Sequence, residues 1–210
     1  MTLQETILGA IEIDKGSRKK RVFIVKANQA YVDSSMNINA LSSYGRLDVV
    51  ARSAIAALID RAGVRKDTVF YAVLEGRSKP FVLELDGENL GTRFESEAEF
   101  GILVRQVVCG TPTRGVVVYN FTFEDLVLSL LKAYGKENVY YLHELGLDVS
   151  MLRLKEGSAF ILGDHKGIDA QTERWLKSQG ITWLSLGSTP YFTESCITFI
   201  HAVLDGFISP

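Results

Sequence analysis

The chain alternates short apolar runs with segments of helical periodicity, and this alternation restricts its fold more than any other feature. Runs rich in β-branched and aromatic residues predict strands at 21–26, 68–74, 81–85, 116–119, 139–142, 158–162 and 181–186. Apolar residues at helical spacing predict helices at 45–61, 96–108, 122–134, 170–178 and 195–204. Strands that alternate with helices are typical of an α/β fold with a mostly parallel sheet and helices on both faces.

Local signals place several of the boundaries. Ser96 with Glu99, and Thr122 with Asp125, have the spacing of capping boxes at helix starts. Gly63 follows the helix predicted at 45–61 as a stop signal. The polar segment 27–44 predicts a long loop, and loops of this length inside compact domains are often functional.

Length and charge limit the classes of protein to which the chain can belong. It has 210 residues, of which 47% are hydrophobic and 23% charged, which excludes a disordered or collagen-like protein. The net charge of -2 argues against a protein that coats nucleic acid, although a basic patch on one face is compatible with it. We expect an N-terminal arm over 1–20 and a single domain over 21–210.

The cysteines and the apolar runs indicate where the protein works. Cys109 and Cys196 are too few for a disulfide framework. The N-terminal segment lacks the order of a signal peptide, and no apolar run reaches the ~18 residues of a membrane helix. These features predict a cytoplasmic protein with no membrane partner.

Two glycine-containing loops follow predicted strands, at 163–167 (GDHKG) and 187–193 (GSTPYFT). Ligands of open α/β sheets bind at the carboxyl ends of strands, where these loops lie. Neither loop is GxGxxG or GxxxxGK[ST], which disfavours a dinucleotide or a phosphate-loop nucleotide. Ordinary tight turns also explain both glycines, and Thr193 or Ser195 could simply cap the following helix.

Metal and thiol chemistry have weaker support. His143 and His165 have no third ligand at useful spacing, so we expect no metal site. Cys196 could be a nucleophile at a helix N-terminus, but its place on an apolar helix stripe favours a small packing residue.

Four segments together resemble the SPOUT-class tRNA (pseudouridine-54-N1)-methyltransferases of archaea, which have bacterial relatives. They are GRLDVVARS at 45–53, YYLHELG at 140–146, FILGDHKGID at 160–169 and SLGSTPYFTESCITFIHAVLD at 185–205. The resemblance covers residues 21 to 207 in the same order. It implies a SPOUT fold with a trefoil knot in about 138–207, S-adenosylmethionine as cofactor and a homodimer.

Carried over position by position, the resemblance implies a set of cofactor contacts. They are Leu142, Gly163, Leu186, Gly187, Ser188, Thr189, Pro190, Tyr191 and Cys196. Backbone groups of tight loops can recognise adenine, and Leu142 and Cys196 can supply apolar walls. Leu142 could equally be a buried strand residue.

The implied reaction is methyl transfer to N1 of pseudouridine 54 in tRNA, and it requires the N1 proton to leave. Asp48 and Asp33 are candidate proton acceptors, and Arg46 could bind a phosphate or stabilise the developing anion. Asp48 could also simply favour the helix dipole. The candidate RNA contacts are Arg18, Lys19, Lys20, Arg21, Arg46, Arg52 and Arg93.

The chain departs from the family pattern in two places. It has about 20 residues before the first strand, and Ala40–Tyr44 stands where some members have an Asp-Leu-Pro-Gly-like segment before the GR-[LM]-D motif. Two alternatives therefore stay open. One is a SPOUT methyltransferase acting on a ribosomal RNA pseudouridine or a ribose 2′-hydroxyl, and the other is a non-catalytic RNA-binding or assembly protein.

Overall fold

A seven-stranded sheet forms the centre of the protein in a computed structural model that describes residues 20–77 and 79–207. Its strand order is β6-β5-β4-β1-β8-β7-β9. The strands are β1 (Arg21–Ala27), β4 (Thr68–Leu74), β5 (Phe81–Asp86), β6 (Val116–Tyr119), β7 (Val139–Asp148), β8 (Ala159–Gly163) and β9 (Thr182–Ser185). Strands β4, β1, β8, β7 and β9 pair in parallel, whereas β5 pairs antiparallel with β4 and β6. The prediction of a mostly parallel sheet is confirmed.

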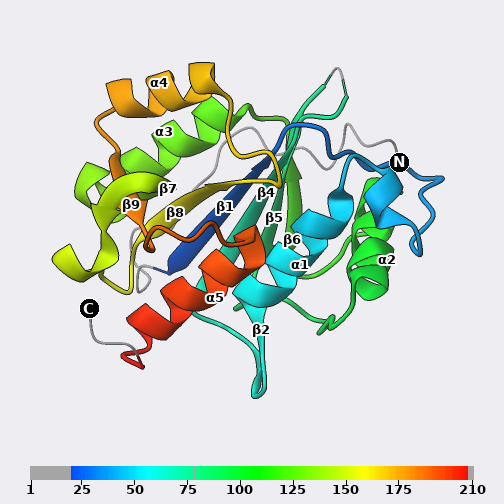
Figure 1. Cartoon of the computed structure of the whole chain (residues 1–210). Helices are drawn as coiled ribbons and strands as arrows, with labels where there is room; N and C mark the ends of the chain where they lie inside the picture. The colour runs from blue at the N-terminus through cyan, green and yellow to red at the C-terminus, as the bar shows by residue number, and fades with distance from the viewer. Residues whose placement is uncertain (1–19, 78, 208–210) are drawn as a thin grey trace.

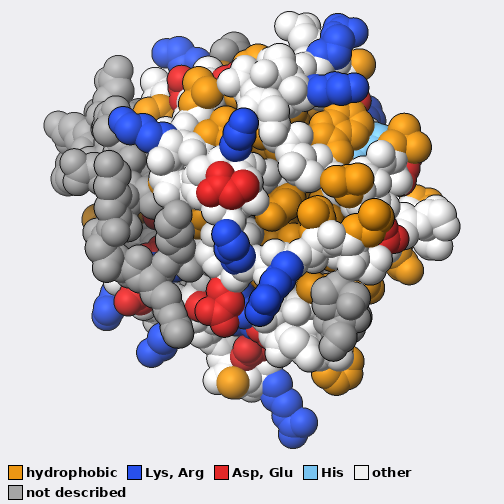
Figure 2. All heavy atoms as spheres, turned by 90° about the vertical axis from the view of Figure 1, so that its left-hand side faces the viewer, with side chains coloured by type: hydrophobic (Ala, Val, Ile, Leu, Met, Phe, Trp, Pro, Cys, Tyr) orange, Lys and Arg blue, Asp and Glu red, His pale blue; other side chains and the backbone are white. Residues whose placement is uncertain are grey.

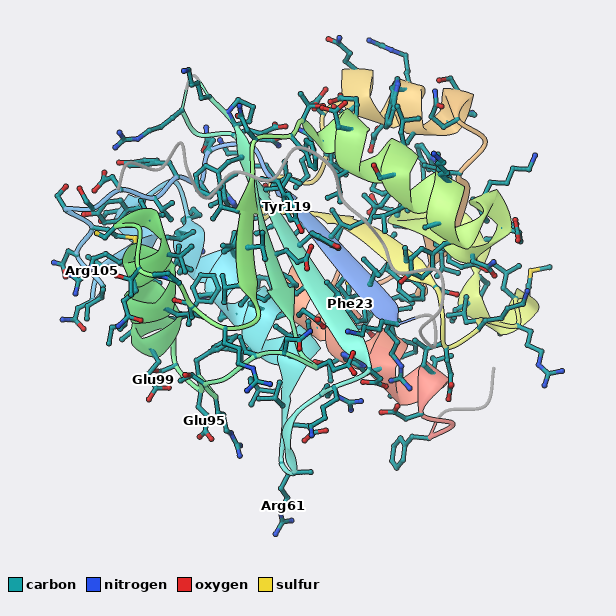
Figure 3. The ribbon with its side chains drawn as sticks, turned by 180° about the vertical axis from the view of Figure 1, so that it is seen from behind. Phe23, Arg61, Glu95, Glu99, Arg105 and Tyr119 are labelled. Carbon is teal, nitrogen blue, oxygen red and sulfur yellow. The ribbon has the colours of Figure 1, made fainter. Side chains whose placement is uncertain are left out.

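Helices cover both faces of the sheet, as predicted (Figure 1). The helices are α1 (Leu47–Leu58), α2 (Glu97–Val108), α3 (Phe123–Tyr134), α4 (Ala170–Ser178) and α5 (Thr193–Leu204). Successive side chains of a strand point to opposite faces, so Phe23 and Val25 of β1 pack with α1, α2 and α5. Val22 and Ile24 pack with α3 and α4, which lie in front of the sheet in Figure 3.

The helix predicted at 45–61 is shorter than its apolar pattern. It ends at Leu58 because β2 (Ile59–Asp60) pairs antiparallel with β3 (Gly63–Val64). Gly63 therefore belongs to a small hairpin and is not the helix stop. Arg61 lies at the tip of this hairpin, far from the carboxyl ends of the parallel strands (Figure 3).

The last helix begins earlier than predicted. Its first residue is Thr193, and its N-cap is Phe192, which makes no side-chain cap hydrogen bond. Thr193 instead donates its hydroxyl to the carbonyl of Gly163 at 2.9 Å, so it joins α5 to the end of β8. The alternative that Thr193 or Ser195 caps α5 is therefore wrong. The Thr193 hydroxyl binds the end of β8, and Ser195 already lies inside the helix.

One predicted capping box is complete and the other is half formed. Thr122 accepts from the Asp125 backbone N–H, and the Asp125 carboxylate accepts from the Thr122 backbone N–H, at the start of α3. At α2, Ser96 accepts from the Glu99 N–H, but the Glu99 carboxylate accepts from Glu95.

Two expectations lie beyond what this structure tests. The arm predicted over 1–20 falls outside the described residues except for Lys20, and the trefoil knot stays a prediction. In the described part of the chain, no helix is long and apolar enough to cross a membrane.

A buried histidine predicts how stability depends on pH. Arg21 Nη1 donates to His201 Nδ1 at 3.2 Å, and His201 Nε2 donates to the carbonyl of Ala57 at 3.0 Å, so the ring is neutral. Burial, together with the charge of Arg65, lowers the pKa of His201 to about 4. An unfolded histidine has a pKa of about 6.5, so between these values the unfolded chain binds the extra proton.

We therefore expect stability to fall as pH falls from about 6.5 to about 4, with His201 contributing up to about 3 kcal/mol. Urea unfolding of the wild type and of His201→Gln across this range measures the effect. The wild type should lose more stability than the variant on acidification. Equal losses would show that His201 is not the group responsible.

Candidate active site

A cavity of about 400 Å³ lies at the carboxyl ends of β7, β8 and β9. Parallel pairing brings these three ends to one edge of the sheet, where α/β proteins bind ligands. The loop after β8, the loop after β9 and the first turn of α5 form its walls. A volume of this size is within the range of sites for small molecules and cofactors.

The structure brings most of the predicted cofactor residues together around this cavity. Eight of the nine line it: Leu142, Gly163, Leu186, Gly187, Thr189, Pro190, Tyr191 and Cys196. Ser188 lies in the same loop but does not line the cavity. Their role as cofactor contacts stays a prediction.

The loop after β8 is held tightly by its neighbours. A Cβ on Gly163 would lie 2.4 Å from the carbonyl carbon of Gly167, so only glycine fits there. The buried carboxylate of Asp164 accepts from the backbone N–H of Asn28 at 3.1 Å and of Lys166 at 2.8 Å. The Asn28 side chain also donates to the carbonyl of Gly167. The end of β1 thus fixes the backbone that lines the cavity.

The opposite wall combines a glycine of positive φ with an inert thiol. Gly187 has φ +109°, which L side chains rarely adopt, and its N–H donates to Ser185 Oγ at 3.1 Å. Burial raises the pKa of the Cys196 thiol to about 11. Cys196 is therefore protonated at neutral pH, which disfavours a nucleophile and suits an apolar wall.

Sequence patterns missed a polar group on the α4 side of the cavity. Tyr141 donates to Glu173 Oε1 at 2.8 Å, and His143 Nε2 lies 3.5 Å from the same oxygen. All three residues line the cavity. Tyr141 and His143 share one face of β7, but their partner on α4 could not be predicted from spacing. His165 lines the same cavity, and no metal-binding group of three or more side chains occurs among the described residues.

A cluster of charged side chains joins α1 to α2 and α5. Asp48 is buried and accepts from Arg46 Nε at 2.9 Å and from Arg52 Nη1 at 3.0 Å. Arg52 also binds Glu97 at 2.8 Å and Glu194 at 2.9 Å. Glu194 belongs to the first turn of α5, whose Thr193 and Cys196 line the cavity. This group of Arg46, Asp48, Arg52, Glu97 and Glu194, which we call the Asp48 cluster, is therefore connected to the cavity wall.

The electrostatics of this cluster favour the ionised carboxylate of Asp48. Burial alone would raise the pKa of Asp48, but hydrogen bonds from Arg46 and Arg52 hold it below its ordinary value. Arg46 has φ +66°, and among the described residues it is the one non-glycine with a positive φ. Such strain is kept where the surrounding structure holds it, frequently at functional sites.

Comparison with known proteins decides the family. Residues 20–207 match a family described as "Putative SAM-dependent RNA methyltransferase". The chain belongs to this family. The family resemblance found in the sequence is confirmed, and so is S-adenosylmethionine as the cofactor.

Several curated archaeal relatives of the family share most of the chain. The chain is 35% identical to a tRNA (pseudouridine(54)-N(1))-methyltransferase of Methanocaldococcus jannaschii, covering 88% of this chain and 96% of that protein. A protein of the same name from Methanococcus aeolicus is 32% identical, with coverage of 87% and 96%. The solved structure of Archaeoglobus fulgidus Nep1 bound to S-adenosylhomocysteine has the same fold, with a TM-score of 0.63, 13% identity and coverage of 90% and 98%.

The cavity residues of this methyltransferase fit S-adenosylmethionine. The space beside Gly163 is filled by the backbone of Gly167, so this glycine keeps the loop that lines the cavity closely packed. The open space beside Gly187 lies at the same cavity. Leu142, Leu186 and Cys196 offer apolar surface for a purine ring.

The methyltransferase presents few of its predicted RNA contacts freely. Arg93 is exposed and pairs with Glu95, and the half-buried Arg46 pairs with Asp48. Lys20 pairs with Asp86 and Glu88, each at 2.7 Å.

Two more of these residues are already held by carboxylates, and two lie outside the described residues. Arg21 is 4% exposed and binds Asp205 at 2.6 Å, so a phosphate cannot reach it. Arg52 is occupied by three carboxylates and acts as a structural link between helices. Arg18 and Lys19 are not among the described residues.

Proposed function

We propose that this protein methylates N1 of pseudouridine 54 in tRNA and works as a homodimer. Support comes from curated relatives of that name that are 31–35% identical over most of both chains. The structural observation that carries the proposal is the convergence of the two glycine loops and α5 on one cavity. The Asp48 cluster adjoins that cavity through Glu194.

The cavity residues hold and orient the cofactor in this proposal. Bound S-adenosylmethionine supplies an electrophilic methyl group. Leu142, Leu186 and Cys196 would enclose the purine, and the backbone after Gly163 and Gly187 would make the polar contacts. Such positioning would let N1 of the base approach the methyl carbon in line, so proximity would contribute much of the rate.

The Asp48 cluster acts on the base. Transfer to N1 would break the carbon–sulfur bond of the bound cofactor as the new bond to the methyl carbon forms, and the N1 proton would pass to water. Arg46 stabilises the negative charge that develops on the base. Asp48 is a weak proton acceptor because its pKa is lowered, so it serves to orient Arg46 through two hydrogen bonds. Asp33 is bound to Arg77 at 2.6 Å, which makes it a less available acceptor than its loop position indicates.

Exposed apolar side chains support the homodimer. Leu145, Met151 and Phe192 are each more than 70% exposed, and they belong to β7, the turn after it and the loop before α5. Figure 2 shows hydrophobic side chains gathered on this side of the molecule. Exposed apolar surface of this kind favours association. Sedimentation equilibrium of the wild type should give a dimer at micromolar concentration. A wild-type protein that is a monomer, with the same mass as the Leu145→Asp variant, would refute the homodimer.

Two tRNA transcripts test the substrate. One carries pseudouridine at position 54 and the other uridine, and both are incubated with protein and labelled S-adenosylmethionine. The proposal predicts labelling of the pseudouridine transcript alone, since uridine has a glycosidic bond at N1. Equal labelling of both would favour a 2′-hydroxyl or another nucleotide. No labelling with intact cofactor binding would favour a non-catalytic RNA-binding protein.

A further inference from the structure

Two tyrosines and an arginine form a stack that neither the cofactor cavity nor the Asp48 cluster explains. The rings of Tyr31 and Tyr44 lie 5.4 Å apart between centroids and are tilted by 59° to each other, so Tyr44 supports the Tyr31 ring from the side. The guanidinium of Arg77 lies over the Tyr31 ring, 4.6 Å from its centroid. We call this group the Tyr–Arg stack. Arg77 is exposed and both tyrosines are partly exposed, so one end of the stack faces solvent.

The stack lies at the same edge of the sheet as the cavity. Tyr31 follows the end of β1, and Arg77 follows the end of β4. Asn28, three residues before Tyr31, binds both Asp164 and Gly167 of the cavity loop. Tyr44 is two residues from Arg46 in the Asp48 cluster. The stack therefore lies beside the region where the target base is proposed to react.

Glycines bring the three segments of the stack together. A Cβ on Gly45 would lie 1.7 Å from the carbonyl oxygen of Gln29, and a Cβ on Gly76 would lie 2.0 Å from the same oxygen. The Tyr31 N–H also donates to the carbonyl of Tyr44. Close backbone packing thus fixes the spacing of the stack before any ligand binds, which lowers the entropy that binding must remove.

Local partners hold Arg77 and Tyr44 in position. Arg77 binds Asp33 Oδ2 at 2.6 Å while it covers the Tyr31 ring. Tyr44 accepts from the backbone N–H of Asn37 at 2.8 Å. Because Asp33 balances the charge of Arg77, the guanidinium offers a planar surface more than an unpaired charge. A planar, charge-balanced surface suits the face of a base better than a phosphate.

We infer that the Tyr–Arg stack binds an unpaired nucleotide of the RNA substrate next to the nucleotide that is methylated. This inference rests on the proposed function, because it takes RNA as the partner. Single-stranded and extruded bases are bound by stacking on aromatic rings and arginine planes. A base that stacks on the outer face of Arg77 would extend the contact between Arg77 and Tyr31 by one planar group.

Paired variants separate stacking from charge. The probe is a tRNA transcript with pseudouridine 54, and its affinity is measured by filter binding at about 50 mM and about 200 mM salt. Tyr31→Ala and Arg77→Ala should each weaken binding about tenfold at both salt concentrations, since stacking does not depend on counterions. Tyr31→Phe keeps the ring and should bind as the wild type does.

Controls locate the effect on the stack. Arg61→Ala removes an exposed arginine at the opposite end of α1 and should leave affinity unchanged (Figure 3). Calorimetry with S-adenosylmethionine should give the same affinity for every variant, which shows that the fold and the cavity are intact.

Each result decides one of the two proposals. If Tyr31→Ala and Arg77→Ala bind the transcript as tightly as the wild type does, the inference that the Tyr–Arg stack binds a nucleotide is overturned. A loss for Arg77→Ala that vanishes at high salt would also overturn it, by showing a phosphate contact. If the unaltered protein binds S-adenosylmethionine but no tRNA, the proposed function itself fails.

Discussion

Replacing Gly163 by alanine is expected to weaken S-adenosylmethionine binding roughly 10- to 100-fold, which corresponds to about 1–3 kcal/mol of overpacking. The added Cβ would meet the carbonyl carbon, Cα and carbonyl oxygen of Gly167 at 2.4, 2.5 and 2.8 Å. All three are backbone atoms, so no side-chain rotation relieves the contact. The loop that lines the cavity must move instead.

Gly91→Ala is the matched control for this change. A Cβ at Gly91 would meet only the Arg114 side chain, at 3.4 Å or more, and Gly91 has an ordinary φ away from the cavity. Calorimetry measures the affinity of both variants for S-adenosylmethionine, and thermal melting measures the stability of each. Unchanged cofactor affinity in folded Gly163→Ala would show that the cavity after β8 is not the cofactor site.

Asp48→Asn is expected to lower kcat about 100-fold or more while leaving cofactor affinity unchanged. The carboxylate accepts from Arg46 at Nε and Nη2 and from Arg52 at Nη1. An amide has one oxygen and no charge, so Arg46 loses the partner that orients it. Single-turnover methyl transfer to the pseudouridine 54 transcript, together with calorimetry, separates the two effects.

Glu97→Gln serves as the control for Asp48→Asn. It removes one charged partner of Arg52 but leaves Arg46 and Asp48 paired, so kcat should change far less. Full activity of Asp48→Asn would remove Asp48 from the chemistry. An equal loss in both variants would show that the cluster only supports the packing of α1, α2 and α5.

The sequence predicted the parts of the fold that depend on local signals. Continuous apolar runs marked the central strands, and Thr122 with Asp125 marked the start of α3 because both partners of the cap lie within four residues. The β2–β3 hairpin was missed because two-residue strands show no alternation, and Ile59 continues the helical pattern of α1.

The parts that escaped prediction depend on contacts between distant segments. Arg21 looked like part of a basic run, yet the start of β1 places it against Asp205, 184 residues away. The glycine loops marked the cavity, but Glu173 could not be linked to Tyr141 without the sheet that brings α4 beside β7. The Tyr–Arg stack likewise joins residues from two strand ends that only the parallel pairing of β1 and β4 brings together.

The identity of the nucleoside at position 54 after reaction tests the proposed function most directly. The wild-type protein, S-adenosylmethionine and the pseudouridine 54 transcript are incubated, and the tRNA is digested to nucleosides for mass spectrometry with fragmentation. The account predicts a pseudouridine that carries one additional methyl group on N1 of the base. An unmodified pseudouridine, or a methyl group on the ribose or on another nucleotide, would contradict it.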